Sequence, residues 1–572
     1  MGLMNSALHI GRNALLGYQG ALQVVGSNIS GAGSADYTRL TPQLDSLPNL
    51  GGVALQPGAG VALTDIRRNI DLALENRLRL STAEVESLSK QQAALAEIET
   101  YFDDLDGTGI PTLLSEFFGG FEAVGSDPEA DRGLVVRKGE ELAGRLKALR
   151  GKLGELGEGL DSQIEELAVV ADDLAERIAE LNGRITVAEA RSRGDASGLR
   201  DQRDALLRKL GELVDVTARE QPNGVMNVYI GSEALVQGGY ARGLTTATQV
   251  VDGFRRTSVV FADSGAVVRP QGGQIAGLMQ ARDVQAFGRI QELDAFAQGL
   301  IQAVNRVHAD GQGLSGFSSL TGTYGALATD AALNSASAGL PSPVQNGAFH
   351  VVVSDGTRVG SRVHVVAVDL DGLNGDDTTL ASLVERLNAI DHLEATLTPD
   401  NRVSLTADAG FTFSFGHDGQ RARSDTSGAL AALGLNTFFD GTNAADIAVN
   451  DAVGGDAQKL AASTVFRSGQ GDNAAALAQL LDTAGAGFNT PPVQARWDAM
   501  AGDVAVSAAA VNSALEGADG IRSSLQAQRE SISGVSLDEE AIEMIKYERA
   551  FQGAARYVSV VDQLINEVMN IV

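Results

Sequence analysis

The stretch that most constrains the fold is GVSLDEEAIEMIKYERAFQGAARYVSVVDQLINEVMNIV, Gly534–Val572. Its apolar side chains recur at alternating spacings of three and four residues, which is typical of a coiled-coil seam. Asp538, Glu539 and Glu540 occupy the expected first turn, where the helix dipole favours negative charge. The stretch therefore predicts a C-terminal helix with one apolar seam, formed by Met544, Tyr547, Phe551, Ala554, Val558, Val561, Ile565, Val568 and Val572.

The N-terminal residues show the same alternation. The apolar and small residues that follow it are Met4, Leu8, Gly11, Leu15, Tyr18, Leu22, Val25 and Ile29. Two heptad helices at the two ends are expected to pair with each other or with neighbouring copies. The backbone entropy lost in ordering one such helix exceeds what burial of its seam returns, so folding of both ends should be coupled to assembly.

Between the ends, helical and alternating patterns predict a nested, multidomain fold. Its class is a mainly α core of long helices with coiled-coil termini and inserted β-rich and α+β domains. The predicted divisions are terminal helices 1–35 and 535–572, an elongated helical core of 36–213, 272–315 and 456–534, a small β-rich segment 214–271, and an inserted α+β domain 316–455.

Several local features fill in this plan. Thr38–Leu63, with Pro42, Pro48 and Pro57, is interpreted as a turn-rich connector. Periodicity predicts a helix from about Leu134 to Leu213, interrupted or kinked by Gly151, Gly154, Gly157 and Gly159. A hairpin turn is expected at Pro222–Gly224. In the insert we expect strands at Phe349–Val353, Arg362–Leu370, Arg402–Ala407 and Phe411–Phe415, and a helix at Leu380–Asn388.

Composition excludes several classes of function. The 572 residues contain 44 basic and 73 acidic side chains, a formal net charge of −29, so nucleic acid and anionic membrane surfaces are disfavoured partners. The absence of cysteine excludes disulfides and thiolate chemistry. The uncharged stretch Asn13–Ala35 is interrupted by Gln19 and Gln23 and reads as an amphipathic helix, so no membrane insertion is expected. Export would then need a route without a cleaved signal.

No pattern predicts catalysis. The six histidines lack metalloprotease spacing, and neither a nucleophile elbow nor a Walker A motif occurs. His350, His364 and His417, with Asp418 nearby, share the insert and could converge on a metal, although their spacing is unspecific. The acidic residues Asp369, Asp371, Asp376 and Asp377 lack the register of a calcium loop and are interpreted as a solvated turn. We therefore expect no catalytic, cofactor-binding or metal site, and no enzyme.

Several motifs together resemble the axial proteins of the bacterial flagellum, the rod, hook and hook-associated family. Gly534–Val572 resembles the family's C-terminal signature, and SNISGAGSADYTRL (Ser27–Leu40) is similar to its N-terminal ending, with Asp36 in place of glycine and Leu40 in place of glutamine. The hook-associated branch at the hook–filament junction is the most similar. Its internal blocks are matched by Leu199–Gly231, Gly272–Asp283 and Leu300–Gly316, and Thr426–Gly441 resembles an element found in the inserts of some members.

The resemblance implies a secreted structural subunit of the extracellular flagellum at the hook–filament junction, without a cofactor. Implied partners are copies of itself in a ring or tube, the hook protein, hook-associated protein 3 and a flagellar export chaperone of the type III system. Two alternatives are another axial protein, such as hook-associated protein 3 or a flagellin, and a secreted adhesin or enzyme whose insert is the active part. The predicted assembly seam is Met4, Leu8, Leu15, Tyr18, Leu22, Val25, Ile29, Met544, Tyr547, Phe551, Val558, Val561, Ile565 and Val568. The insert should project outward, so its deletion from Phe317 to Gly455 should be mild.

Overall fold

The computed structural model describes residues 2–34, 36–47, 58–103, 107–127, 130–191, 196–251, 253–356, 361–417, 423–465, 470–483 and 491–571. The chain divides into two compact units. Unit 1 consists of residues 1–93, 158–282 and 509–572, and unit 2 of residues 94–157 and 283–508. Three long helices contribute residues to both units: α2 (Leu72–Phe102), α4 (Arg132–Arg191) and α12 (Val493–Ser533). A mixed helical and α+β multidomain fold results, as the sequence predicts.

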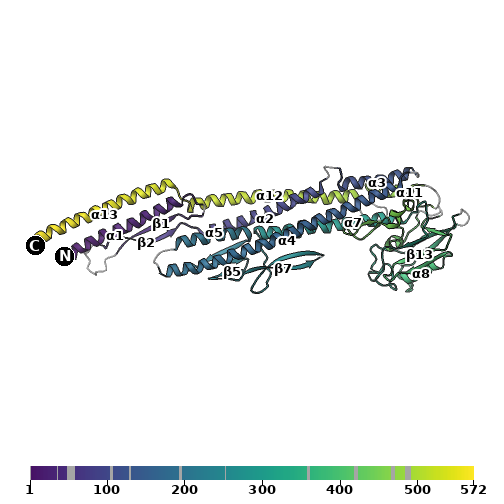
Figure 1. The fold of residues 1–572 in the computed structure, drawn as a ribbon, viewed down its shortest axis with the longest axis horizontal. Coiled ribbons are helices and arrows are strands. Elements are labelled where there is room, and N and C mark those ends of the chain that lie inside the picture. The colour runs from purple at the N-terminus through teal and green to yellow at the C-terminus, as the bar shows by residue number, and fades with distance from the viewer. Residues whose placement is uncertain are drawn as a thin grey trace. The chain divides into compact units, whose positions relative to one another are not determined.

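In unit 1 the two ends of the chain form the helices α1 (Gly2–Gly31) and α13 (Leu537–Ile571), which lie side by side (Figure 1). α1 also packs on an antiparallel hairpin of β1 (Leu40–Ser46) and β2 (Val61–Arg68). The interpretation of Thr38–Leu63 as a connector was therefore wrong, because β1 and part of β2 fall inside it. Proline suggested a loop there, but a two-stranded ribbon leaves each strand one free edge, and Pro42 in β1 needs no second partner. Pro48 and Pro57 lie outside the described residues.

The remainder of unit 1 combines helices with two small sheets. The predicted turn at Pro222–Gly224 is confirmed, and Gly224 adopts a φ of 78° between the first two strands of the larger sheet. The helices are α5 (Ser197–Leu213) and α6 (Gly273–Gln280), and a π-helical turn, Ala281–Ala286, follows α6. The four-stranded sheet has the order β3 (Val216–Glu220), β4 (Met226–Ile230), β5 (Glu233–Gln237), β6 (Tyr240–Ala241), and β7 (Leu244–Val251) pairs with β8 (Phe254–Phe261).

α4 runs without interruption through the glycines that were expected to break it. The predicted Leu134–Leu213 span contains two helices, α4, which ends at Arg191, and α5, which begins at Ser197. Gly157 is required for packing, because a Cβ atom there would lie 2.3 Å from the ring of Phe287. A glycine in a helix can therefore mark a close neighbour as well as a kink.

Unit 2 is built on helices that share an aromatic core. Phe117 of α3 (Ile110–Ser126) packs against Phe121, Phe438 and Phe439 with ring centroids 5.2–5.5 Å apart. The single tryptophan, Trp497, is 2% exposed and contacts Phe102 and Phe296. The other long helix is α7 (Phe287–Ala309), and shorter helices are α10 (Asp451–Gly455) and α11 (Asp472–Ala478).

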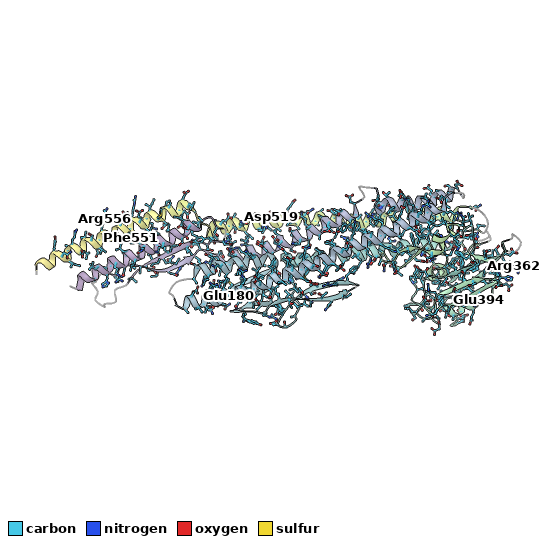
Figure 2. The ribbon with its side chains drawn as sticks, in the orientation of Figure 1. Glu180, Arg362, Glu394, Asp519, Phe551 and Arg556 are labelled. Carbon is cyan, nitrogen blue, oxygen red and sulfur yellow. The ribbon has the colours of Figure 1, made fainter. Side chains whose placement is uncertain are left out.

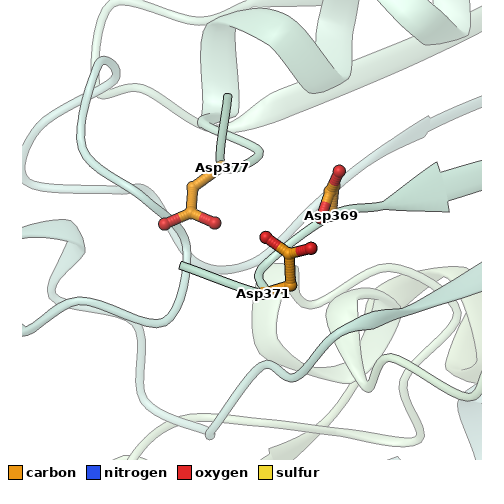
Figure 3. Close-up of side chains that lie close together, drawn as sticks. All are labelled: Asp369, Asp371 and Asp377. Atoms are coloured by element: carbon orange, nitrogen blue, oxygen red, sulfur yellow. The ribbon is translucent and has the colours of Figure 1, made fainter. Parts of the chain in front are cut away.

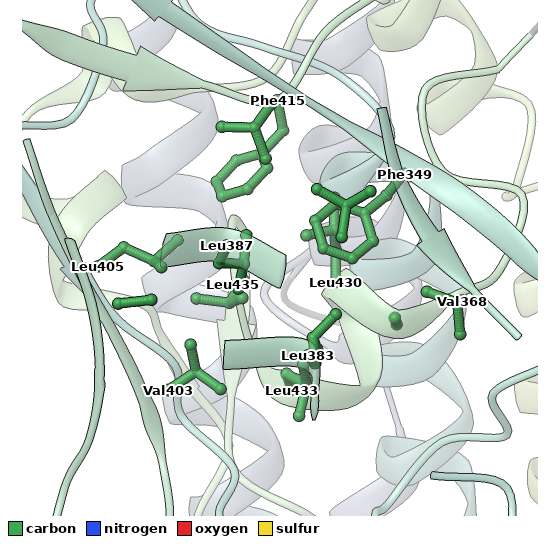
Figure 4. Close-up of a cluster of buried hydrophobic side chains, with 14 of the residues drawn as sticks. Phe349, Val368, Leu383, Leu387, Val403, Leu405, Phe415, Leu430, Leu433 and Leu435 are labelled. Atoms are coloured by element: carbon green, nitrogen blue, oxygen red, sulfur yellow. The ribbon is translucent and has the colours of Figure 1, made fainter. Parts of the chain in front are cut away.

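The β-rich part of unit 2 has its own hydrophobic core. Figure 4 shows side chains from strands and helices, among them Phe349, Leu383 and Leu430, converging in this core. The predicted helix at Leu380–Asn388 is confirmed as α8, capped by Thr379. One sheet has the order β11 (Arg362–Val368), β10 (Gly347–Ser354), β14 (Thr412–Ser414), and the other β12 (Leu393–Leu397), β13 (Val403–Ala407), β9 (Ser319–Thr321). Short elements are α9 (Ala429–Leu433), β15 (Phe439–Asp440), β16 (Ala448–Val449) and 3-10 turns at Ala336–Ala338 and Ala457–Lys459.

The last part of the predicted insert packs directly on the helices of unit 2. The Asn305 side chain of α7 donates to the Phe439 carbonyl oxygen at 2.7 Å and accepts from the Phe438 and Phe439 amides. The ring of Phe438 enters the aromatic core beside Phe117 and Phe121. Deleting Phe317–Gly455 would remove this packing, so the expectation of a mild deletion no longer holds.

His308 makes the stability of unit 2 dependent on pH. The side chain is fully buried, its Nδ1 donates to the Asn436 carbonyl oxygen, and its Nε2 accepts from the Ala461 amide. Burial lowers the pKa of His308 to about 4. Between about pH 6.5 and this value the unfolded chain binds a proton that folded His308 does not, so stability falls as the pH falls.

We expect the free energy of unfolding of the wild type, relative to that of His308→Gln, to drop by roughly 2–3 kcal/mol between pH 7 and pH 4.5. Asp310, whose pKa burial raises to about 6, acts in the opposite direction, but it is present in both proteins and cancels in the difference. Urea unfolding followed by Trp497 fluorescence measures this difference. If the difference in free energy of unfolding between the two proteins stays constant with pH, the lowered pKa assigned to His308 is wrong.

Candidate functional site

The predicted seam residues of α13 divide into packed and exposed positions. Tyr547 and Val561 are buried, and Phe551, Ala554, Val558 and Ile565 are half-buried. Met544 is 41% exposed and does not share their burial. The side chain of Val568 and residue Val572 lie outside the part described.

On α1, Val25 is buried, while Leu8, Leu15, Tyr18, Leu22 and Ile29 are half-buried. The side chain of Met4 lies outside the described part of the chain. Val25 and Ala21 form a small core with Tyr547 of α13, and Tyr18, Leu22 and Ile29 pack around it together with Leu44 of β1. The structure therefore brings predicted seam residues of both helices together near the joint with the rest of unit 1.

A second close contact lies farther along the two helices. An added Cβ atom at Gly11 would lie 2.3 Å from the Cγ2 atom of Val558, so glycine is needed for this approach. At the other end of the pair, Asn28 lies beside Glu540. These two contacts define an antiparallel register, in which Leu8 lies opposite Val561.

Two buried and two half-buried residues form a polar cluster at the joint, which we call the clasp: Asn28 and Glu540, and Tyr37 and Arg39. Asn28 Nδ2 donates to Glu540 Oε2 at 2.9 Å, and Arg39 Nε donates to Glu540 Oε1 at 2.8 Å. The Tyr37 hydroxyl donates to Asn28 Oδ1 at 2.9 Å. Asn28 and Glu540 are only 1% and 2% exposed, so the clasp ties the end of α1 to the first turn of α13 through a buried hydrogen bond.

The surroundings of Tyr37 in the clasp keep its hydroxyl protonated. Burial, together with the charges of Asp201 and Glu540, raises the pKa of Tyr37 to about 12, so its hydroxyl remains a donor at neutral pH. Arg39 also pairs with exposed Glu539 at 2.8 Å, and its amide donates to the Ser533 carbonyl oxygen. The clasp therefore also holds the end of α12.

The structure shows the contacts made at both departures from the N-terminal family ending. Asp36 pairs with Arg208 of α5 at 2.5 Å. Leu40 meets Asn28 only through its backbone, since its amide donates to Asn28 Oδ1 and its carbonyl oxygen accepts from Asn28 Nδ2. The hydrogen bonds between residue 40 and Asn28 therefore do not depend on which side chain residue 40 carries.

Sequence reasoning missed Asn28 and Glu540 as partners. Both belong to the terminal motifs. Asn28 precedes Ile29 of the apolar stripe, and Glu540 lies in the acidic first turn of the C-terminal helix. Tyr37 and Arg39 belong to the N-terminal motif Ser27–Leu40, which did not indicate their partners. The available signal was a polar residue inside an apolar stripe, but nothing local indicated which residue it meets.

The internal motif Leu199–Gly231 has a structural role in unit 1. Arg203 is fully buried and donates to the Asn182 side chain and the Gly224 carbonyl oxygen, which joins α5 to α4 and to the β3–β4 turn. Arg68 of β2 pairs with Asp201 at 2.7 Å and Asp204 at 2.5 Å. The motif therefore anchors the hairpin beneath α1 to the helical part of the unit.

α13 also carries apolar side chains on the face turned away from α1, which we call the outer face. Its members are Ile542, Ile545, Val560 and Leu564, which are 48–66% exposed. Figure 2 shows α13 with its side chains, including Phe551 of the packed face and exposed Arg556. A row of exposed large apolar residues on one helix is a feature of interaction surfaces.

The histidines considered for a metal do not converge. In the β10–β11 register His350 is opposite Val365 and His364 is opposite Val351, so the two imidazoles lie on opposite faces of the sheet. His350 Nδ1 is bonded to the Ser424 carbonyl oxygen, and the His417 amide to Thr464. Asp418 lies outside the described residues.

Three carboxylates of the acidic turn lie together, those of Asp369, Asp371 and Asp377 (Figure 3). Asp377 accepts a hydrogen bond from the Gly372 amide, and Asp371 accepts one from the Leu373 amide. These bonds stabilise the turn itself. Among the described helices, none combines the length and the hydrophobicity that a membrane crossing requires.

Replacing Glu540 by glutamine should loosen the pairing of α1 with α13. The change removes a 2%-exposed carboxylate that serves both Asn28 and Arg39, at an expected cost of about 2–4 kcal/mol in the local opening free energy. Amide hydrogen exchange of α1 and α13 measures this effect. Glu539→Gln removes the exposed partner of the same arginine and should cost less than about 1 kcal/mol. Equal protection loss in the two variants would argue against the clasp.

Comparisons with known proteins agree with the motifs. Residues 95–323 match the family model described as the flagellar hook-associated protein FlgK helical domain. Residues 526–571 match the model of the flagellar basal body rod FlgEFG protein C-terminal region. The first match contains the internal motif of unit 1, and the second contains α13 and the Glu540 side of the clasp.

The curated relatives described next share one name. Flagellar hook-associated protein 1 of Escherichia coli is 24% identical over 585 residues, covering 99% of this chain and all of the relative. The protein of that name from Bacillus subtilis is 25% identical over 226 residues, 38% of this chain and 44% of the relative. The flagellar hook junction protein FlgK from Burkholderia pseudomallei aligns with 80% of this chain at 15% identity and a TM-score of 0.48. On the two model matches and the relative matched along its full length, the chain is similar from end to end to flagellar hook-associated protein 1.

Proposed function

We propose that this chain is a structural subunit of the bacterial flagellum that joins the hook to the filament, and that α1 and α13 are the elements through which its copies assemble. The observation that carries the proposal is the pairing of the two chain ends, which the clasp closes at the joint. Such a pair presents one composite surface, built from the two segments that the family resemblance places at the assembly interface.

The outer face of α13 is the surface that a second copy would cover. The pairing with α1 already uses Tyr547, Phe551 and Val558, so these positions are satisfied within one chain. Val560 and Leu564, 54% and 52% exposed, remain available. We infer that the predicted seam packs α13 against α1 within one subunit, and that the outer face of α13 contacts a neighbouring subunit.

The partners follow from this position in the flagellum. We propose the hook protein on one side of the tube and hook-associated protein 3 on the other, with the assembled copies in the extracellular flagellum. Before export by the flagellar type III system, an export chaperone would cover the same apolar surface of α13, which is an aggregation hazard when exposed.

We propose no enzymatic role. In support, His308 and His350 make hydrogen bonds in the core, and two carboxylates of the acidic turn accept backbone amides. The alternative, an adhesin with an active insert, would place function in the β-rich part of unit 2.

A deletion strain complemented with this chain tests the proposal. Loss of the protein should leave hooks without filaments and release flagellin into the medium, and expression of the full chain should restore attachment. An adhesin predicts the reverse, normal filaments with loss of binding to surfaces. Attached filaments in the deletion strain would refute the proposed function.

A further inference from the structure

At the start of α4 in unit 2 lies a buried cation that has no counter-charge among the described residues. Arg132 is 6% exposed, and within the described part of the chain its guanidinium makes one hydrogen bond, from Nη1 to the Leu460 carbonyl oxygen at 2.8 Å. Its Nε is buried without a partner. The neighbouring Asp131 carboxylate is engaged elsewhere, by Arg137 at 3.0 Å and by the Gly133 amide. Arg132 therefore keeps most of its donor capacity unused.

This situation differs from that of every other buried arginine in the described ranges. Each of the others has a carboxylate near its guanidinium, as Arg282 has Asp161 at 2.5 Å and Arg289 has Glu292 at 2.7 Å. The remaining two, Arg79 and Arg203, have such neighbours in Glu75 and Asp204. A buried charge is normally paired because an unpaired one is strongly disfavoured. The exception at Arg132 indicates that its partner is not part of the described chain.

Arg132 lines a cavity of about 250 Å³. The described walls contain no acidic residue, although the chain as a whole has 73 of them, and Arg132 is their only charged side chain. The polar wall residues are Gln312, Ser315, Ser354, Thr412, Ser414, Ser463 and Gln470. The cavity is thus positively charged and polar within a protein of net charge −29.

The polar wall is held in place before any ligand enters. Ser414 Oγ donates to Gln312 Oε1 at 3.1 Å, and Gln312 Nε2 donates to the Val465 carbonyl oxygen at 2.9 Å. Ser463 Oγ donates to the same carbonyl oxygen. These bonds fix polar side chains of the cavity wall, so that ordering them costs a ligand little.

We propose that this cavity binds a small oxyanion, of the phosphate, sulfate or carboxylate class, through the guanidinium of Arg132. Guanidinium groups bind such anions through paired N–H donors, and the volume accommodates a phosphate with several waters. Burial removes water from the guanidinium and thereby lowers the pKa of Arg132. A bound anion would compensate for this loss of hydration by placing a negative charge beside the guanidinium. The site lies within unit 2 and does not depend on the proposed assembly.

Thermal unfolding of the full chain, followed through Trp497 in the same unit, provides the test. Sodium phosphate, sulfate and acetate are each titrated to 20 mM against sodium chloride at equal ionic strength. We expect at least one of the oxyanions to raise the unfolding temperature by about 2–5 °C, as a dissociation constant near 1 mM predicts. An effect of acetate alone would identify a carboxylate as the ligand, and an effect of phosphate or sulfate would identify an inorganic anion.

The variants separate a specific site from general salt effects. Arg132→Gln should abolish the shift, whereas the matched control Arg137→Gln removes the same charge five positions away, from a side chain 57% exposed, and should retain it. If Arg132→Gln does not fold, Thr412→Asp decides, because a carboxylate on the cavity wall should eliminate binding with Arg132 intact. Isothermal titration calorimetry of the wild type with phosphate, sulfate and acetate measures binding directly. No shift in the wild type, or equal shifts in the wild type and whichever of these two site variants folds, would overturn the proposal.

Discussion

Replacing Val561 and Ile565 together by aspartate should detach filaments from hooks and release flagellin into the medium. Val561 is 8% exposed and Ile565 half-buried on the face of α13 that packs on α1. Each unpaired buried charge costs several kcal/mol, and the defect recurs in every copy of the assembly. Electron microscopy of hooks and quantification of flagellin in the medium measure the outcome.

The matched control is Gln563→Asp combined with Asn566→Asp. Both residues are exposed on the same turns of α13, so the two new charges remain solvated. This strain should assemble normal filaments. Normal filaments in the Val561→Asp, Ile565→Asp strain as well would show that the pairing of α1 with α13 is not needed for attachment.

Replacing Phe438 by alanine should lower the free energy of unfolding of unit 2 by about 3–5 kcal/mol. The ring is fully buried, and its centroid lies 5.2 Å from that of Phe117 and 4.8 Å from that of Phe439. Its loss leaves a cavity where the predicted insert meets α3. Urea unfolding monitored by Trp497 fluorescence reports on this unit alone, because the chain contains no other tryptophan.

Phe411→Ala provides the comparison. That ring is half-buried and stacks on exposed His392 with centroids 3.9 Å apart, so its loss should cost less than about 2 kcal/mol. A small effect of Phe438→Ala, equal to that of Phe411→Ala, would mean that the insert folds independently of the helices. In that case the deletion of Phe317–Gly455 should have the mild effect that the sequence predicts.

The elements predicted correctly are those fixed by short-range patterns. The helix at Leu380–Asn388 has apolar residues at helical spacing and a capping residue before it, and the β3–β4 turn has a glycine where a positive φ is required. The terminal helices were likewise evident from heptad spacing. In each case the information lies within a few residues of the element.

The elements that were missed depend on distant partners. β1 exists because β2 pairs with it, and α4 continues through Gly157 because Phe287 fills the space there. The hydrogen bond between Asn28 and Glu540 spans 512 positions in the chain, so no local window contains both residues. Heptad spacing also could not separate the two apolar faces of α13, since it grouped exposed Met544 with buried Tyr547.

The central claim is that the outer face of α13 is covered by neighbouring copies in the flagellum. The absence of cysteine allows a single thiol to be introduced by Val560→Cys, at a position 54% exposed in the subunit. The control is Val250→Cys, at a position 72% exposed on β7. Maleimide labelling is compared between the purified subunit and intact flagella. We predict that the thiol at position 560 reacts in the free subunit and is protected in flagella, while the thiol at position 250 reacts in both. Equal labelling at position 560 in the subunit and in flagella would contradict the account.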